Sequence, residues 1–214
     1  MLVHPWDSAT DAAQARDFVE TQGFGHLLAC GRGRDVPVAV PTQYVLDGDV
    51  DGDLVVVLHL ARPNPVWAAI EENPTVMLIV AGDWAFVPAA WKALGSEDPA
   101  MGIPTTYYAA VQLTGQAQII DDQAAKADLL RLQQRVLDPD GGWADPAEHG
   151  RVLSGIRGLR ITVSEMRAKF KYGGNVDRAH RLAVADRLRS RAGPGDAAAL
   201  AHLLRRLDQP APGA

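Results

Sequence analysis

The stretch VVLHLARPNPVWAAIEENPTVMLIV, residues 56–80, contains two apolar, strand-like runs joined by a short helical segment. The first run ends near His59, and Arg62 follows in the turn that leads into the helix. Backbone amides at the start of a helix lack intrahelical partners and carry partial positive charge. With an imidazole and a guanidinium beside them, these amides would form a phosphate site. The alternative is that His59 ends a strand and Arg62 is a solvated turn residue.

Asn64 marks the start of the helical segment, because it precedes Pro65 and a residue before proline favours extended geometry. An extended asparagine can cap the helix with its side chain. It can also act as a third hydrogen-bond donor to an anion. Asn73-Pro74 then ends the helix before the next strand.

Runs of strand length recur on both sides of this stretch, separated by Gly- and Asp-rich clusters that are typical of turns. The runs before residue 61 follow one another closely and predict an antiparallel meander. Many short strands with little helix between them favour a closed barrel, since closure removes exposed strand edges. The predicted strands are residues 26–31, 36–46, 54–60, 76–81, 84–87, 105–120 with a break near Gly115, and 158–163.

Apolar residues at helical spacing predict helices around the strand-rich part. Ser8 and Asp11 have the spacing of a capping box for a first helix, which Gly23 ends. Asp121 and Asp122 provide a cap for a later one. The predicted helices cover residues 12–22, 64–72, 122–137, 177–191 and 196–207, and the Pro-rich residues 209–214 are expected to be disordered. The pattern is that of a mainly β protein with helices, in the α+β class.

Composition narrows the function. The 214 residues have a net charge of −5 and a single cysteine, Cys30, whose apolar neighbours predict a buried thiol. No apolar run is long enough to span a membrane and no signal peptide is expected, so a cytoplasmic location fits best. The histidines show no metal-ligand spacing, and hydrolase and dinucleotide-binding motifs are missing. We therefore predict no catalytic constellation and no metal site.

Five motifs in order resemble the PaiB-type FMN-binding family, which belongs to the FMN-binding split barrels and is described as transcriptional regulators. The segment at residues 59–65 resembles H-x-A-R-x-N-P, which in that family lies at the flavin phosphate. The other four are A-Y-V-S-P-x-W at residues 85–91, V-P-T-W-N-Y at 103–108, G-F-E-I-x-I at 158–163 and K-x-K-L-S-Q-N at 169–175.

The resemblance runs from about residue 38 to residue 191, which is most of the chain. It implies an antiparallel split β-barrel with a helical C-terminal region. Residues 1–175 would form the FMN-binding barrel, residues 176–207 helices packed on it, and residues 208–214 a disordered tail.

The resemblance also implies which residues touch the flavin. Thr105, Thr106 and Tyr107 would line a crevice that holds the isoalloxazine ring at a dimer interface. The alternative is that these β-favouring residues simply form the barrel wall.

Lys169 and Lys171 would add positive charge from one face of a strand, because strand side chains alternate with period two. They could equally be solvated lysines on a sheet edge. Asn175, from the same motif, is either a ligand contact or a turn residue.

The sequence departs from the family at positions that could contact a ligand. The family's H-L-P-F reads Val40-Pro41-Thr42, its Trp-Asn pair reads Thr106-Tyr107, its Ser-Gln pair reads Gly173-Gly174, and the tyrosine after the loop tryptophan is Lys92. These departures leave open weak FMN binding, another flavin-like cofactor, or loss of the cofactor.

The resemblance implies an FMN-binding homodimer that acts as a flavin-dependent oxidoreductase or as a sensor linked to transcription. In an enzyme of this kind the cofactor carries the difficult chemistry. A DNA-binding regulator is the first alternative, although the acidic net charge argues against it. Its candidate contacts are Arg178, Arg181, Arg187, Arg189 and Arg191. A haem-binding barrel, with His26 or His59 as axial ligand, is the second.

Overall fold

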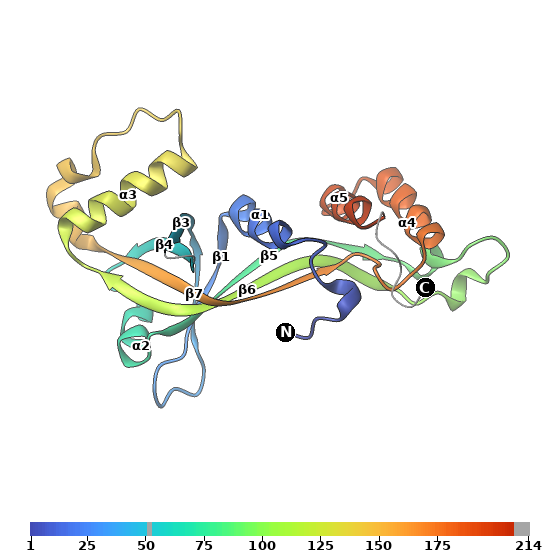
Figure 1. Cartoon of the computed structure of the whole chain (residues 1–214), viewed down its shortest axis with the longest axis horizontal. Coiled ribbons are helices and arrows are strands. Elements are labelled where there is room, and N and C mark those ends of the chain that lie inside the picture. The colour runs from blue at the N-terminus through green and yellow to red at the C-terminus, as the bar shows by residue number, and fades with distance from the viewer. Residues whose placement is uncertain (51–52, 208–214) are drawn as a thin grey trace. The chain divides into compact units, whose positions relative to one another are not determined.

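The computed structural model describes residues 1–50 and 53–207. Its strands form one sheet whose assigned registers are antiparallel (Figure 1), so the predicted mainly β class with helices is confirmed. The hydrogen-bonded order is β2 (Val38–Gln43), β1 (Phe24–Ala29), β5 (Thr75–Val87), β6 (Thr105–Ile120), β7 (Ile156–Lys171), β4 (Asp53–Ala61) and β3 (Val45–Val50). The order runs from β2 to β3 without closing, so the sheet is open where closure was expected.

Helices follow or precede the strands at the predicted places. The α-helices are α1 (Ala12–Gln22), α2 (Val66–Glu72), α3 (Gln123–Leu137), α4 (Arg178–Arg191) and α5 (Asp196–Arg206). Short 3₁₀ segments are η1 (Pro5–Asp7), η2 (Ala89–Lys92), η3 (Pro99–Met101) and η4 (Pro146–Gly155). Within the described ranges, none of the helices is both long enough and apolar enough to cross a bilayer.

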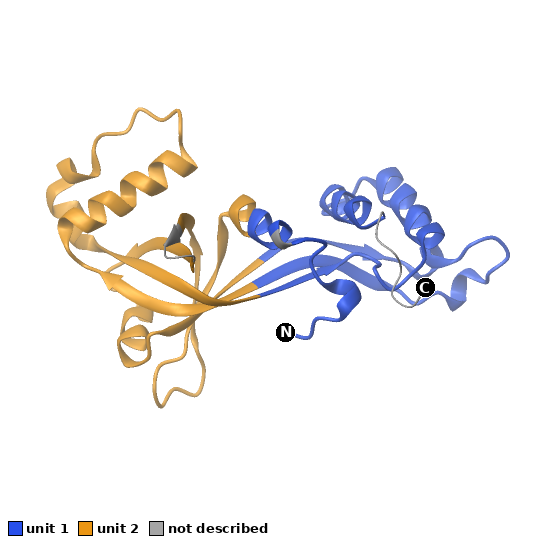
Figure 2. Ribbon diagram, in the orientation of Figure 1, with its two compact units in different colours: residues 1–18, 81–111, 167–214 blue, residues 19–80, 112–166 orange. Residues whose placement is uncertain are grey.

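The chain forms two compact units that interleave along the sequence (Figure 2). Unit 1 consists of Met1–Phe18, Ala81–Val111 and Arg167–Ala214, and unit 2 of Val19–Val80 and Gln112–Met166. In unit 2, α3 packs through Leu129 on a buried valine cluster of β3 and β4. In unit 1, α4 and α5 bury Val184, Leu188 and Leu203, and Arg206 of α5 donates to the carbonyl of Phe170 in β7.

The predicted strand at residues 36–46 is two strands, and the predicted meander is wrong. β2 pairs with β1, whereas β3 pairs with β4, so they lie at opposite ends of the strand order. Tyr44 separates them. Its backbone N–H donates to Gly23 O at 3.0 Å and its buried hydroxyl donates to Val19 O at 2.5 Å. These long-range bonds divert the chain, and an apolar run does not reveal them.

The later strands are longer and more regular than predicted. β5 is continuous where two strands were expected, and β6 continues through Gly115 without a break. A Cβ at Gly115 would lie 2.3 Å from Thr162 O, so this glycine allows close approach of the β7 backbone. β7 extends eight residues beyond Val163, through an exposed polar run that resembles a loop.

Cap chemistry is only partly as predicted. Asp122 caps α3 by accepting from Ala125 N, as expected. At α1, however, Asp11 accepts from Ala13 N and Gln14 N, and Gln14 Oε1 accepts from Thr10 N at 2.6 Å. The Ser8 hydroxyl instead donates to His4 O, because it belongs to the preceding 3₁₀ turn.

Cys30 is exposed, and the predicted buried thiol is wrong. β1 ends at Ala29, so Cys30 lies beyond the last buried position of the strand, where its carbonyl accepts from Asn73 Nδ2. The tail predicted to be disordered, residues 208–214, lies outside the described residues.

Candidate functional site

A cavity of about 350 Å³ in unit 1 brings together five of the predicted cofactor-binding residues. β6 and β7 are neighbours in the sheet, and alternation places every second side chain of each strand on this side. The residues are Thr105 and Tyr107 on β6, Lys169 and Lys171 on β7, and Asn175 just after it. Thr106 alternates away and does not line the cavity. We call this site the lysine cavity.

The lysine cavity is positively charged. Lys169 is buried, donates to Leu2 O at 3.0 Å and lies 3.6 Å from the carboxylate of Asp7. Lys92 and Lys171 also line the cavity, and among the residues that the structure describes neither has an acidic partner. Burial, together with the nearby Lys171, lowers the pKa of Lys92. An anionic ligand would therefore relieve repulsion between these cations.

Tyr107 contributes a hydroxyl group without a partner. Its side chain is 1% exposed, and within residues 1–50 and 53–207 the hydroxyl finds no hydrogen bond. Burial raises its pKa to about 12, so the group is a neutral donor. Gly173 leaves room for it, since a Cβ there would lie 2.5 Å from the Tyr107 oxygen. A buried hydroxyl without a partner is expensive, and a ligand acceptor would offset that penalty.

Some residues of the cavity were not predicted as ligands. His4 and Trp6, whose rings stack with centroids 4.6 Å apart, come from the N-terminal segment, which carries no recognisable motif. Ile103 and Lys92 come from the connection between β5 and β6. Lys92 was visible in the sequence only as a departure from the family pattern.

Arg62 lies in unit 2 and is bound by acceptors within the chain. Its guanidinium forms two hydrogen bonds with Asp121, at 2.9 and 2.5 Å, and one with Ser154 O at 2.5 Å. Lys126 and Arg157 each lie 3.3 Å from the same carboxylate. We call this group the Asp121 cluster. Arg62 lowers the pKa of Asp121 most, with a further contribution from Lys126. The predicted phosphate contact at Arg62 stays a prediction, and a phosphate there would compete with Asp121.

His59 and Asn64 also have partners within unit 2. His59 Nδ1 lies 2.6 Å from Gln133 Oε1. Asn64 Oδ1 accepts from Val66 N at 3.0 Å, and Asn64 O accepts from Trp67 N. The side chain therefore caps α2, as one of the two readings of Asn64 predicted. These bonds satisfy amides that were expected to be free for an anion.

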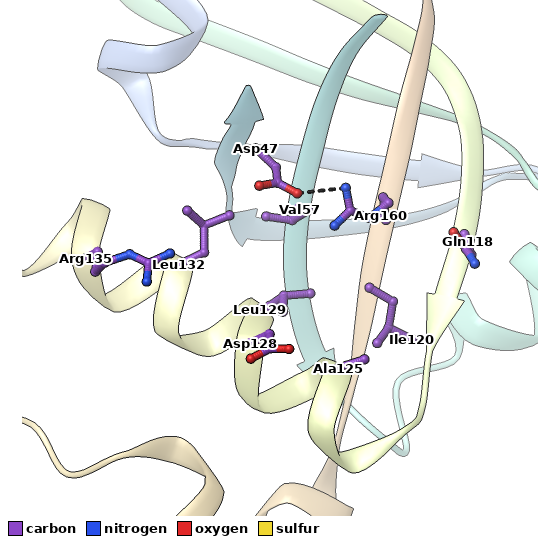
Figure 3. Close-up of a pocket in the computed structure, with 10 residues that line it drawn as sticks. All are labelled: Asp47, Val57, Gln118, Ile120, Ala125, Asp128, Leu129, Leu132, Arg135 and Arg160. Carbon is purple, nitrogen blue, oxygen red and sulfur yellow. Dashed lines mark ion pairs between the residues drawn. The ribbon is translucent and has the colours of Figure 1, made fainter. Parts of the chain in front are cut away.

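A second cavity, of about 450 Å³, lies in unit 2 between α3 and the sheet (Figure 3). Leu129 and Leu132 of α3 and Val57 of β4 form its apolar side. Asp47 and Arg160 form an ion pair at 2.7 Å on its polar side. Two acids, Asp47 and Asp128, line this cavity beside two cations, Arg135 and Arg160, whereas Asp7 faces three lysines in the lysine cavity.

Of the five arginines of α4, Arg181 is buried, whereas Arg178, Arg187, Arg189 and Arg191 are exposed. Arg181 is 2% exposed and donates to Arg206 O at 2.6 Å, so its predicted DNA contact is wrong. Arg189 pairs with Asp186 at 2.6 Å and Arg191 with Asp196 at 2.5 Å. Burial of one face of the helix against α5 explains why Arg181 points inward.

The chain is similar to a protein of known name over almost its whole length. It is 23% identical over 199 residues to the protease synthase and sporulation protein PAI 2 of Bacillus subtilis (strain 168), covering 91% of this chain and 92% of that protein.

Two solved structures share the fold. The flavocytochrome Anf3 from Azotobacter vinelandii has a TM-score of 0.60 at 20% identity, covering 78% of this chain and 71% of that one. The FAD and heme binding protein from Mycobacterium smegmatis has a TM-score of 0.55 at 19% identity, covering 77% and 73%. The predicted antiparallel split-barrel fold is confirmed.

The family assignment rests on a protein family that matches more than half of the chain. Residues 1–165 match the protein family described as "Putative FMN-binding domain", which includes four of the five motifs quoted above and every strand from β1 to β6. The resemblance read from the motifs is thereby confirmed. This chain belongs to that FMN-binding domain family.

Proposed function

We propose that the chain is a flavoprotein that binds FMN in the lysine cavity of unit 1. The observation that carries the proposal is the buried hydroxyl of Tyr107, which lacks a partner in the described residues and belongs to a residue that lines the same cavity as Lys92 and Lys171. Membership of an FMN-binding family supports the identity of the ligand. The cavity volume of about 350 Å³ lies within the usual range for small-molecule sites.

The residues of the cavity suit the two ends of a flavin nucleotide. Lys92 and Lys171 would hold the phosphate, because a phosphate dianion accepts charge-assisted hydrogen bonds from ammonium groups. Thr105 and Tyr107 would donate to polar atoms of the ligand, and Trp6 offers an aromatic surface to the heterocycle.

When bound, the flavin would supply electron-transfer chemistry, and the protein would supply binding and orientation. We assign the chain to a flavin-dependent oxidoreductase or a flavin sensor on this basis. A link to transcription is part of the proposal only through the family resemblance, since Arg181 of α4 is buried and Arg189 and Arg191 pair with acids of the chain.

The proposal includes a homodimer. Trp84 and Phe86 on β5 in unit 1 are 64% and 47% exposed, which is unusual for large aromatic side chains of a strand. A second copy of the chain would cover them. Mass photometry of the purified protein tests this part separately, and a monomer at every concentration would contradict it.

The test of the function is an FMN titration of three proteins, followed by flavin fluorescence. We expect the unaltered chain to bind FMN, and Lys171→Gln to bind it about tenfold more weakly, the loss of roughly one charge-assisted hydrogen bond. Arg62→Gln is the matched control in unit 2 and should leave the affinity unchanged.

Riboflavin, which lacks the phosphate, separates phosphate contacts from ring contacts. Lys171→Gln should not change riboflavin affinity if Lys171 holds the phosphate. Loss of FMN binding in Arg62→Gln but not in Lys171→Gln would place the phosphate at the Asp121 cluster instead. A colourless protein that ignores FMN would overturn the proposal altogether.

A further inference from the structure

The connection between β5 and β6, residues 88–104, contributes Lys92 and Ile103 to the lysine cavity. It also borders a neighbouring cavity of unit 1, of about 500 Å³, which shares Lys92, Ile103 and Asn175 with the first. The position of this connection therefore decides where Lys92 stands relative to a ligand.

The connection is held to α4 at two points. Arg191 lies over the ring of Trp91, 4.4 Å from its centroid. Glu97 Oε2 lies 3.5 Å from His180 Nε2 and also accepts from Leu94 N at 2.8 Å. Glu97 is thus fixed within its own loop, and its contact with His180 ties that loop to the first turn of α4.

His180 lies between two carboxylates. Its Nδ1 is 2.9 Å from Asp177 Oδ2, while Nε2 faces Glu97 on the opposite side. A neutral imidazole has one N–H group, whereas the imidazolium has two. Only the protonated ring can donate to both carboxylates at once. The bond to Glu97 or the bond to Asp177 must be given up when the ring loses its proton.

The surroundings favour the protonated ring. The carboxylate of Asp177, which also caps α4, raises the pKa of His180 most, and Glu97 adds to the effect. The other charged groups on the wall of the neighbouring cavity are Lys92 and Asp98. Because the pKa of His180 is raised above 6.5, the doubly bonded form persists to higher pH than for a free imidazole and is lost as the pH rises through the raised pKa.

We propose that His180 is a positioning residue for the flavin site, which acts by clamping the 88–104 connection to α4 and so holding Lys92 at the lysine cavity. The inference rests on the proposed function, since it concerns the same site. His180 itself does not line the lysine cavity and need not touch the ligand. Its protonation state would make flavin affinity depend on pH.

The experiment measures FMN affinity from pH 6.5 to pH 8.5 for the unaltered chain, His180→Gln and Glu97→Gln. At the acidic end both variants should bind FMN about threefold more weakly, the size expected for a partly exposed pair. At the alkaline end the three proteins should converge. The FMN phosphate titrates near pH 6 in every sample, and Lys92 is present in all three, so the differences between proteins isolate His180.

Glu97→Gln is the second variant because it alters an exposed loop side chain, whereas His180 lies in the first turn of α4. Superimposable affinity profiles for the unaltered chain and His180→Gln would overturn this inference while leaving FMN binding intact. Failure of the unaltered chain to bind FMN at any pH would instead overturn the proposed function, and this inference with it.

Discussion

The lysine cavity of unit 1 and the Asp121 cluster of unit 2 are both groups of three cations, and they differ in what neutralises them. In unit 2 the carboxylate of Asp121 forms ion pairs with all three cations. A second carboxylate, that of Glu71, pairs with Arg157 at 2.8 Å. Among the described residues of unit 1, Asp7 is the only acid within ion-pair distance of one of the three lysines. The paired cations of the Asp121 cluster connect the ends of neighbouring strands, whereas the excess of cations in the lysine cavity supports the proposed anionic ligand.

The largest change in stability should come from removing the carboxylate of the Asp121 cluster. We expect Asp121→Ala to lower the free energy of unfolding by about 2 kcal/mol, less than for a fully buried pair, because Lys126 is buried but Asp121 is 41% exposed and screened by solvent. Urea denaturation measures the change. The exposed partner Glu71 gives the control, and Glu71→Ala should have a much smaller effect.

The same variant separates the two possible phosphate sites. If FMN binds in the lysine cavity, its affinity should not change in Asp121→Ala. If the phosphate instead binds in the Asp121 cluster, removal of the competing carboxylate should tighten FMN binding. A tighter FMN complex would therefore contradict the assignment to unit 1.

The next prediction compares two buried tyrosines that differ in whether the hydroxyl has a hydrogen-bond partner among the described residues. Tyr44 in unit 2 donates to Val19 O, whereas Tyr107 in unit 1 has no partner among the described residues. We expect Tyr44→Phe to destabilise the protein by about 1 kcal/mol and Tyr107→Phe to stabilise the ligand-free protein by a similar amount. Thermal unfolding without flavin measures both changes.

Tyr107→Phe should stabilise the ligand-free protein but weaken its binding of FMN. Because the hydroxyl would donate to the ligand, its removal should weaken FMN binding about fivefold, and Tyr44→Phe should leave that affinity unchanged. Destabilisation of the ligand-free protein by Tyr107→Phe would show that the hydroxyl already has a partner within the chain.

The sequence predicts helices and strands well where neighbouring residues determine them, through a cap or an apolar period. Asp122 and Asp177 each precede a helix whose amides they accept from, and the apolar period identifies α3 without tertiary information. The predicted length of β7 is too short because its middle, Ser164–Arg167, is exposed and mostly polar, and pairing with neighbouring strands keeps it extended. Gly115 was read as a break for the same reason, since the strand that it accommodates is distant in sequence.

The candidate site is predictable only in part. Strand alternation correctly grouped Lys169 with Lys171 on one face of β7, and both reach the cavity. The partners of Arg62 could not be predicted, because Asp121 lies 59 residues away and Ser154 lies 92 away. Two departures from the family pattern, Lys92 and Gly173, both line the lysine cavity. Positions that depart from the family pattern can thus lie in the candidate site, as positions that match the pattern do.

The smallest expected effect concerns another matched pair of unit 2. Arg34 contacts Glu72 through two hydrogen bonds, at 3.0 and 2.6 Å, and the side chains are 31% and 37% exposed. Arg34 lowers the pKa of Glu72 below its ordinary 4.5. A depressed carboxyl pKa contributes stability above the unfolded-state value, and that stability is lost as the pH falls through the folded-state value.

Glu72→Gln should therefore unfold at a slightly lower temperature than the unaltered chain at pH 7, and the two melting temperatures should merge as the pH falls through the lowered folded-state pKa of Glu72. Calorimetry at several pH values measures the difference, and added salt should reduce it because the pair is partly exposed. Lys171→Gln provides the contrast from unit 1. It removes a cation without a matched acid, so it should raise or leave unchanged the melting temperature of the ligand-free protein. A melting temperature lowered by Lys171→Gln would mean that the lysine cavity is as internally neutralised as the Asp121 cluster.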